Sequence, residues 1–367
     1  MQSCTFIPLS ELRDMLATGQ SHAIQKLCAA GHPAALAELI SALSVQEIWA
    51  VLEHVDAPLR AEIFSHLQND LQIEIITSLK QQEIAGLLTD MSPDDRADLF
   101  KQLPEQSHDG LLRVLAKTER EDIRRLTAYQ EGTAGTVMTS DYATLSPDLT
   151  ALQAIDRLRE VAPDKETIYY AYVLDEQRRL VGFVSLKDLI VAQRSARVED
   201  IMSRAIIFAR VDDDQEEAAR TIQKYDLLAL PVLSGADAMV GIITHDDAID
   251  IIHQEHTEDM EKFMAITGSH EDAVYMKTPV WQHFKNRSPW VMALAVLGLV
   301  SGFIVQSFEG LLMQFGILAA FMPMLADTGG NTGSQSATLV ASPALTTIVD
   351  ITGLLIYFLT AKTLLGI

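Results

Sequence analysis

The sequence has very few cysteines and far fewer basic than acidic residues. Of its 367 residues only Cys4 and Cys28 are cysteines, which excludes a secreted scaffold held by several disulfides. The 28 basic residues face 50 acidic ones, and the resulting net charge of −22 argues against a nucleic-acid partner, which would select a basic surface. No basic segment followed by an apolar run opens the chain, so we expect no signal peptide and a body that stays in the cytosol.

Charge and hydrophobicity lie in different parts of the chain. Despite the acidity, 48% of the residues are hydrophobic and the mean hydropathy is +0.14. Residues 288–367 contain only four ionised side chains, which are Glu309, Asp327, Asp350 and Lys362. Residues 1–287 hold the other 27 basic and 47 acidic residues and carry a net charge of −20. The length and this division predict two or three acidic soluble units followed by an apolar domain.

Three apolar runs occupy that last domain. Residues 290–305 and 310–326 contain no charge, and residues 341–361 contain only Asp350. A helix needs about 17–25 apolar residues to span a bilayer, so we expect about three membrane helices. The basic residues Lys277, Lys285 and Arg287 precede the first run. By the positive-inside rule the acidic part is cytosolic, and the protein is expected to be a multi-pass protein of the cytoplasmic membrane.

Two polar features interrupt the apolar domain. The segment 327–335 is rich in glycine and amides, and Asn331 with Gln335 would suit a cation path; a solvent-exposed loop is the alternative. Asp350 lies inside the third apolar run, where a carboxylate costs at least a few kcal/mol. Asp350 is therefore a candidate pore residue, with a structural pairing or an interfacial position as the alternatives.

Residues 10–130 have the periodicity of short helices. Apolar residues recur at helical spacing, and prolines or Asn-Asp pairs divide the pattern, as in a helical solenoid, although no strict repeat is evident. Ser92 and Pro93 predict a helix start with Ser92 as the cap. Asp94 and Asp98 then share one face of that helix and could hold a cation together, while the alternative for Asp94 is a favourable interaction with the helix dipole.

From about residue 135 the pattern becomes α/β and repeats itself. Two strand-like runs, a turn and a helix start occur twice, and the pairs Val137-Met138 and Ile201-Met202 open the two copies. Acidic residues are dense in the second copy and beyond it, notably in the segments 212–217 and 246–261. Such a run usually forms a solvated face. If these acids faced one another, however, a hard divalent cation such as Mg²⁺ or Ca²⁺ would relieve their repulsion.

Each copy resembles a CBS domain, and the two together resemble the paired module of that family. The resemblance rests on Gly-Phe-Val-Ser-Leu-Lys-Asp at 182–188 and Gly-Ile-Ile-Thr-His-Asp-Asp at 241–247. In some CBS pairs the Thr and Asp of this motif hold a nucleotide's ribose and phosphate. The resemblance thus makes Thr244 and Asp247 candidate contacts for a nucleotide such as ATP.

The order of segments along the whole chain resembles the MgtE family of Mg²⁺ channels and transporters. The most specific matches are residues 321–339, which contain Gly-Gly-Asn-Thr-Gly-Ser-Gln, and residues 347–358 around Asp350. The lack of a nucleophile elbow, a P-loop or a zinc motif argues against an enzyme, and the resemblance implies a multidomain membrane protein. Its expected parts are a helical superhelix domain (1–134), two CBS domains (135–198 and 199–262), a connecting plug helix (263–287) and an α-helical transmembrane domain (288–367).

The resemblance also implies a mechanism and site residues. Family members are homodimers with a pore on the two-fold axis, where Asp350 would face Mg²⁺ with Asn331 nearby. The family's cytosolic part senses Mg²⁺, and bound ions hold a compact, closed dimer. By motif, the sensing acids would be Asp94, Asp98, Asp214, Glu216, Asp226, Asp247, Asp250, Glu255, Glu258 and Asp259.

The chain departs from the family pattern in its membrane domain. The family has five membrane helices, whereas this chain has room for about three, and the junction lies near residues 339–343. Ser334 and Ser342 also stand where the family usually has Asn. The alternative function is therefore a non-conducting, membrane-tethered sensor of Mg²⁺ or a nucleotide that regulates a partner.

Overall fold

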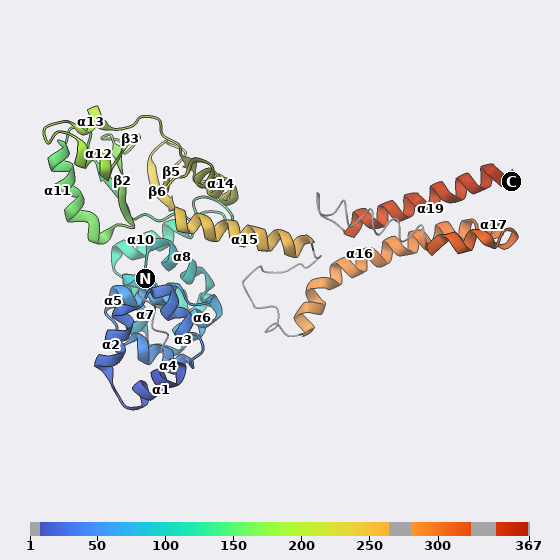
Figure 1. The fold of residues 1–367 in the computed structure, drawn as a ribbon, viewed down its shortest axis with the longest axis horizontal. Coiled ribbons are helices and arrows are strands. Elements are labelled where there is room, and N and C mark those ends of the chain that lie inside the picture. Colours follow the sequence, from blue (N-terminus) through green and yellow to red (C-terminus); the bar gives the residue numbers. More distant parts are fainter. Residues whose placement is uncertain (1–7, 264–279, 324–342, 366–367) are drawn as a thin grey trace. The chain divides into compact units, whose positions relative to one another are not determined.

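Residues 8–263, 280–323 and 343–365 are described by a computed structural model, shown in Figure 1. The chain divides into two units, residues 1–252 and residues 253–367. The first unit contains a helical domain and two small α/β halves, and the second contains long helices.

Ten helices form the first domain, and they begin at a fixed interval. Their first residues are numbers 9, 21, 33, 45, 57, 69, 81, 93, 105 and 117, so each helix with its loop is a twelve-residue repeat. The expectation of a solenoid without a strict repeat was therefore wrong about the repeat. The helices are α1 (Leu9–Ala17), α2 (Ser21–Ala30), α3 (Pro33–Ile40), α4 (Val45–Leu52), α5 (Ala57–Ser65), α6 (Asn69–Ser78), α7 (Gln81–Asp90), α8 (Pro93–Gln102), α9 (Glu105–Val114) and α10 (Lys117–Leu126).

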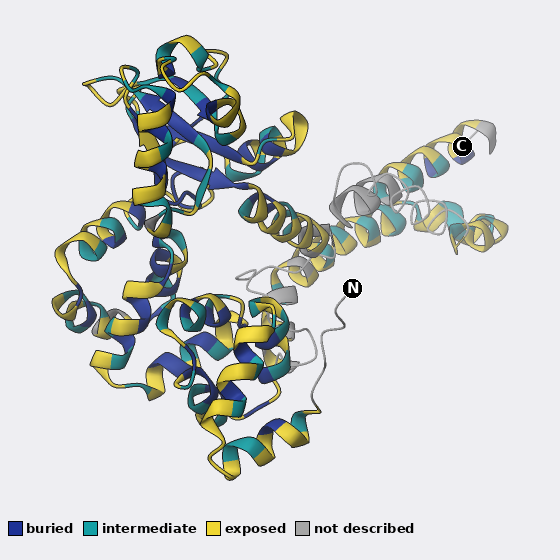
Figure 2. Cartoon of the chain, turned by 60° about the vertical axis from the view of Figure 1, so that its left-hand side comes forward, coloured by how far each residue is buried: buried dark blue, intermediate teal, exposed yellow. Residues whose placement is uncertain are grey.

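The repeat follows from where apolar residues recur. Within a repeat, the seventh and eleventh positions are apolar in most copies, as in Ile63 with Leu67 and Leu87 with Met91, and these side chains are buried. From α3 onward each helix packs on the next but one, α3 on α5 and α5 on α7, with α4, α6, α8 and α10 forming a second row. The buried side chains face the shared interior of the two rows (Figure 2).

The fourth helical position carries a polar group in several later repeats. The Arg60 guanidinium donates to the carbonyls of Leu52 and Val55, and the Gln72 amide donates to three carbonyls at the end of α5. Arg96, which is 5% exposed, donates to the carbonyls of Leu88 and Met91. These side chains satisfy the carbonyls that a helix leaves unpaired at its C-terminus.

The two α/β halves have the same topology. Each is a three-stranded sheet whose first two strands are parallel and whose last two are antiparallel. The first half contains β1 (Tyr142–Leu145), α11 (Ala151–Val161), the 3-10 turn Ala162–Asp164, β2 (Thr167–Leu174), β3 (Leu180–Ser185), α12 (Leu186–Val191) and α13 (Val198–Ile201). The second contains β4 (Ala209–Arg210), α14 (Gln215–Tyr225), β5 (Ala229–Leu233), β6 (Met239–Thr244) and the start of α15 (His245–Phe263).

The segments that open the two halves are exchanged between the sheets. Thr139, before the first half, pairs with Ile242 of β6, and Ser203 pairs with Phe183 of β3. The exchange brings the two backbones so close at Gly241 that an added Cβ would lie 2.7 Å from the Thr139 carbonyl oxygen. The halves are therefore interlocked as one module.

An apolar contact joins the helical domain to the second half. Ala97 of α8 and Leu126 of α10 belong to the same buried cluster as Ala248 and Ile251 of α15. All four side chains are at most 5% exposed. This contact brings the first turn of α8 toward the first turn of α15.

The second unit contains α16 (Val280–Ser307), α17 (Glu309–Gln314), a helical segment at residues 317–323 and α19 (Pro343–Leu365). The first expected span lies inside α16, which also takes in residues 280–287 of the expected plug and continues through Pro289. The second expected span is not one helix, because the chain leaves helical geometry at Phe315 and Gly316. Among the residues that the structure describes, no helix meets the length and hydropathy expected of a membrane-spanning segment.

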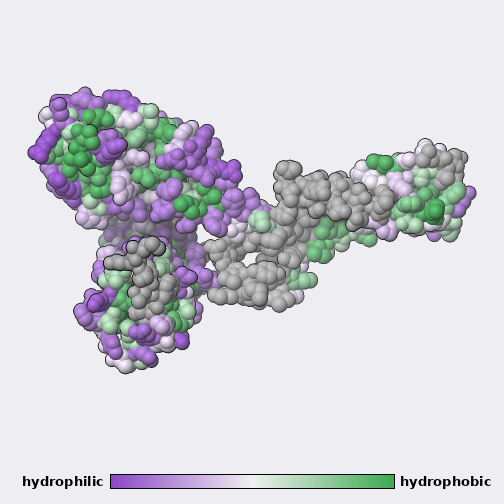
Figure 3. Space-filling model, viewed as in Figure 1, coloured by the Kyte–Doolittle hydropathy of each residue, from purple (hydrophilic) through white to green (hydrophobic). Residues whose placement is uncertain are grey.

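Apolar side chains are nevertheless exposed along α16. Val291, Leu299 and Phe303 are 62%, 74% and 70% exposed, and hydrophobic residues appear on the described surface of this unit in Figure 3. Phe308, which follows α16, stacks on Phe358 of α19 with ring centroids 4.8 Å apart, and α16 itself contacts α19.

Candidate functional site

Five carboxylates from three parts of the first unit influence one another's charge. Asp94 and Asp95 lie in the first turn of α8, Asp246 and Asp247 lie in the first turn of α15, and Glu166 lies just before β2. We call these five residues the junction cluster. The apolar contact between α8 and α15 brings two of these turns together, and like charges then meet at its edge.

Asp94 is the most constrained member of the junction cluster. Its pKa lies well above the usual range, first because burial removes it from water and then because Asp247, Asp95 and Glu166 repel its charge. Its Oδ1 is buried and has no hydrogen-bond partner, although the residue as a whole is only partly buried. The expected cap residue Ser92 does occupy the N-cap of α8, but its side chain makes no capping hydrogen bond.

Asp247 is held at the start of α15 by Thr244. The Thr244 hydroxyl donates to Asp247 Oδ2, and the Thr244 backbone N–H donates to the same oxygen at 3.4 Å. Burial, aided by repulsion from Asp246 and Asp95, still raises the pKa of Asp247 to about 6. The two residues expected to contact a nucleotide therefore form a hydrogen bond with each other.

Glu166 is a member that sequence reasoning missed. Partial removal from water, followed by repulsion from Asp247, Asp246 and Asp95, raises its pKa to about 7. Its backbone N–H donates to the Asp141 carbonyl at 3.0 Å, which fixes the strand start. Because the proximity depends on how three segments pack, no local sequence signal could have identified Glu166.

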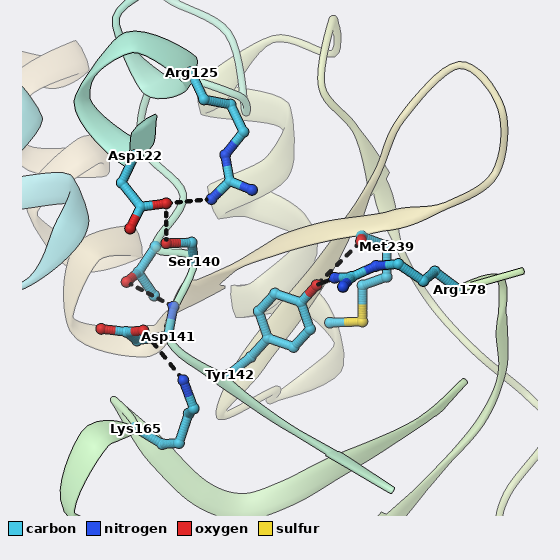
Figure 4. Close-up of polar contacts among 9 residues, drawn as sticks. Asp122, Arg125, Ser140, Asp141, Tyr142, Lys165, Arg178 and Met239 are labelled. Carbon is cyan, nitrogen blue, oxygen red and sulfur yellow. Dashed lines mark hydrogen bonds and ion pairs between the residues drawn. The ribbon is translucent and has the colours of Figure 1, made fainter. Parts of the chain in front are cut away.

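A small polar network holds the surrounding segments in register (Figure 4). The Ser140 hydroxyl donates to Asp122 Oδ1 of α10 at 3.3 Å, and Lys165 Nζ pairs with Asp141 Oδ1 at 3.2 Å. The helical domain, the linker and the first α/β half are thereby connected directly beside Glu166.

Several of the remaining sequence-predicted acids have local partners. Asp98 pairs with Lys101 at 3.0 Å, so α8 does not present Asp94 and Asp98 as an unpaired couple. Asp214 caps α14 by accepting from the backbone N–H groups of Glu216 and Glu217 at 2.8 and 3.2 Å.

Several of the other acids lie at helix ends or along α15. Glu216 forms an ion pair with Arg220. Asp226 ends α14 with φ +50°. The expected acids beyond Asp247 all lie on α15, and they are Asp250, Glu255, Glu258 and Asp259.

Metal-binding geometry does not appear among the described residues, where no three His, Cys, Asp or Glu side chains are placed to hold a metal ion together. Asp350 lies within α19, but its side chain is outside the described part, and Asn331 lies outside the described residues altogether.

A cavity of about 100 Å³ lies between the two α/β halves. Aromatic side chains of the first half line it, among them Tyr170 and Phe183, and the second half adds Ala229 and Pro231. Such a lining suits a flat ring, which aromatic faces stack upon. It is a second candidate place for a nucleotide, separate in its lining residues from Thr244 and Asp247.

Comparison with known families gives matches that follow the observed parts. Residues 31–132 match the MgtE intracellular N domain, and residues 134–195 and 198–254 match the CBS domain. A magnesium transporter MgtE of Thermus thermophilus is 38% identical over 93% of this chain and 76% of its own length. The magnesium transporter MgtE of Bacillus subtilis is also 38% identical, over 62% of this chain and 50% of its own length.

Two solved structures resemble the first unit. The soluble part of a magnesium transporter has a TM-score of 0.64 and 30% identity over 67% of this chain and 97% of its own. The cytosolic domain of the Mg²⁺ channel MgtE in complex with ATP has a TM-score of 0.62 and 35% identity over 66% of this chain and 100% of its own. The relatives that match most of the chain are transporters and not enzymes, as the sequence predicts. The helical domain, the CBS pair and the extent of these matches together show that this chain belongs to the MgtE family of magnesium transporters.

Proposed function

We propose that the chain carries Mg²⁺ across the cytoplasmic membrane as a homodimeric channel, and that cytosolic Mg²⁺ bound by its helical and CBS domains closes it. The observation that carries the proposal is the junction cluster. Asp94 Oδ1 is buried without a partner beside Asp247, and several acids there have raised pKa values. A divalent cation at this edge would relieve both the repulsion and the unsatisfied oxygen.

The chemistry of Mg²⁺ suits a cluster whose carboxylates are not placed to coordinate one ion directly. Mg²⁺ releases its water reluctantly and is often bound by one or two carboxylates, with waters completing its shell. A largely hydrated ion can therefore join Asp94 to Asp247 although no three described acids are placed for direct coordination. The site would be assembled from two domains, so binding would favour the state in which α8 and α15 are together.

The other sensing acids extend the same reasoning over the soluble part. Residues 1–287 carry a net charge of −20, so a dimer would bring about twice that charge together. At high cytosolic Mg²⁺, ions bound to these acids would shift the population toward a compact, closed dimer, and loss of the ions at low Mg²⁺ would favour separation of the units. The proposed sensors other than Asp94 and Asp247 are Asp98, Asp214, Glu216, Asp226, Asp250, Glu255, Glu258 and Asp259.

The proposed pore lies in the apolar second unit. The uncharged runs of the sequence and the exposed apolar side chains of α16 support contact with lipid. Asp350 of α19, with Asn331, would face its counterpart in the second copy and hold a hydrated Mg²⁺ on the two-fold axis. Residues 263–287, of which 280–287 form the start of α16, would act as the plug.

ATP is the proposed second ligand of the CBS pair. A similar cytosolic domain was solved with ATP, and the aromatic cavity offers a place for the adenine ring. Thr244 and Asp247 remain proposed contacts, and the hydrogen bond between them would have to open for Thr244 to reach a ribose or phosphate.

Flux measurement tests the pore. The purified full chain is placed in vesicles, and Mg²⁺ entry is followed with an internal indicator for the wild type and for Asp350→Ala. We expect Mg²⁺ to enter vesicles that contain the wild type, and less Mg²⁺ to enter when Mg²⁺ is also present on the cytosolic face. We expect entry to be lost in Asp350→Ala. No Asp350-dependent entry would refute conduction and favour the membrane-tethered sensor.

Limited proteolysis tests the sensor. Mg²⁺ should protect the wild-type chain from protease at the junction, and Asp94→Asn should need more Mg²⁺ for the same protection. Asp90→Asn is the matched control, because Asp90 is exposed at the end of α7. Equal Mg²⁺ midpoints for all three proteins would refute a sensing role of the junction cluster.

A further inference from the structure

The two halves of the CBS module place different side chains at equivalent positions. Both sheets have the same order and pairing of strands. Thr139 pairs with β6 and Ser203 pairs with β3, so the exchanged segments also correspond. Tyr142 and Ile206 each lie three residues further along the chain and are therefore counterparts. Since Ile206 lines the aromatic cavity, the module has an equivalent place at Tyr142, which we call the Tyr142 site.

The ring of Tyr142 fills the Tyr142 site. Tyr170 and Phe183 line the aromatic cavity, and their counterparts in the second sheet are the smaller Ala229 and Ile242. Ala229 and Ile242 belong to one buried cluster with Tyr142, which is only 7% exposed. Large side chains thus line the open cavity, whereas smaller ones pack with a tyrosine ring at the equivalent place.

The polar end of Tyr142 is anchored by the tips of both hairpins (Figure 4). Its hydroxyl donates to the Met239 carbonyl at 3.0 Å and accepts from Arg178 Nη2 at 3.0 Å. The Met239 N–H in turn donates to the Arg178 carbonyl at 3.1 Å. The counterpart of Arg178 is Asp237, which has the same left-handed backbone conformation but pairs with Arg210 at 2.9 Å. The two places therefore differ in the charge beside them as well as in shape.

We propose that Tyr142 acts as an internal ligand that closes a second ring-binding site of the CBS module. Tyr172 meets the Tyr142 ring edge to face, with ring centroids 6.3 Å apart, and would meet the ring of a ligand in the same way. An apolar cavity of about 150 Å³ opened in a protein core binds a ring such as benzene, and loss of the Tyr142 ring would leave a vacancy with an apolar lining. The inference concerns a different place from the proposed ATP site. It rests on that proposal only for the class of ligand, which is a molecule with a flat aromatic ring such as adenosine.

Equilibrium dialysis of the purified full chain in detergent against adenosine tests the inference in Tyr142→Ala. Adenosine presents the ring without phosphates, so the number bound does not depend on charged contacts. Tyr142→Ala should bind one more adenosine per chain than wild type, and adenosine should raise the melting temperature of this variant by more. Tyr169→Ala is the matched control, because Tyr169 is 64% exposed on the same sheet, and it should bind as much adenosine as wild type. Should Tyr142→Ala fail to fold, Tyr142→Leu also removes the ring and is read in the same way.

Ile206→Tyr is the reciprocal change. It adds a ring to the aromatic cavity and should abolish the adenosine binding that wild type shows; unchanged binding would contradict the correspondence of the two places on which the inference depends. Equal numbers of adenosine bound by wild type and Tyr142→Ala refute the inference. If both bind one, the proposed ring site in the aromatic cavity stands without it. If wild type binds none and Tyr142→Ala binds one, the inference stands and the ring site in the aromatic cavity fails.

Discussion

Neutralising Asp247 should have opposite effects with and without Mg²⁺. Asp247→Asn keeps an oxygen that can accept from Thr244, so the start of α15 is preserved, while the negative charge is removed. The pKa of Asp247 rises from 3.8 to about 6 in the folded chain. A rise of about two units corresponds to about 3 kcal/mol against the charged form.

Screening lowers the part of this energy that acts on the stability of the closed junction. Asp247 keeps intermediate exposure, so water and salt screen part of the repulsion, and about half of the energy is a reasonable expectation. Asp247→Asn should thus favour the closed junction by about 1–2 kcal/mol in Mg²⁺-free buffer at pH 8, or about five- to thirtyfold in population. With Mg²⁺ present the variant should lose affinity, because a charged group of the proposed site is gone.

Hydrogen exchange of the α8 and α15 amides measures this directly. In Mg²⁺-free buffer at pH 8, Asp247→Asn should exchange more slowly than wild type after correction for intrinsic rates. The raised pKa means that the closed state binds the proton more tightly, so the penalty is complete above pH 6 and shrinks as the pH falls toward 3.8. The difference between the proteins should therefore narrow at pH 5.

The control is Asp212→Asn, a charge removed from an exposed position of the same domain. Asp212→Asn should exchange like wild type at the junction at both pH values. A result in which Asp247→Asn exchanges faster than wild type at pH 8 without Mg²⁺ would refute the electrostatic reasoning. It would mean that the charge of Asp247 stabilises the closed junction.

Two further substitutions test the packing that supports the junction. Arg96→Met should lower the free energy of unfolding in urea by about 2–4 kcal/mol, because it leaves the buried carbonyls of Leu88 and Met91 without donors, and an unchanged urea midpoint would contradict this. Gly241→Ala should cost about 1–3 kcal/mol, because its Cβ would lie 2.7 Å from a backbone oxygen. Gly235→Ala has open space around the new Cβ and should leave the melting temperature unchanged; equal melting for both alanine variants would refute the exchanged strand contact.

Much of the architecture was predictable because local patterns determine it. The alternation of strands and turns in the middle segment predicted two similar α/β halves, and both sheets have the same order and pairing. The helical domain was predicted as a solenoid, but its strict repeat was overlooked. The twelve-residue interval is hidden because the fourth position changes from Ile48 to Arg60, Gln72 and Arg96 while keeping one structural place.

The junction cluster was only partly predictable, and the reason is physical. Asp94 and Asp247 were identified from motifs, but Asp98 has a lysine partner three residues away, which a view of the acidic face alone ignored. Glu166 acquires its environment from α8 and α15, which are distant in sequence. Side chains whose properties arise from packing between domains cannot be identified by periodicity along one segment.

The junction combines a small apolar contact with a comparable electrostatic penalty. Ala97 and Ala248 offer little apolar surface, and Leu126 and Ile251 add about 1.5–3 kcal/mol each if fully buried. The raised pKa of Asp247 opposes this contact by a similar order of energy. A ligand at ten to a hundred times its dissociation constant contributes about 1.4–2.7 kcal/mol. Because the opposing terms are close, a weakly bound ion is enough to decide the state, and a tighter apolar contact would make the junction insensitive to it.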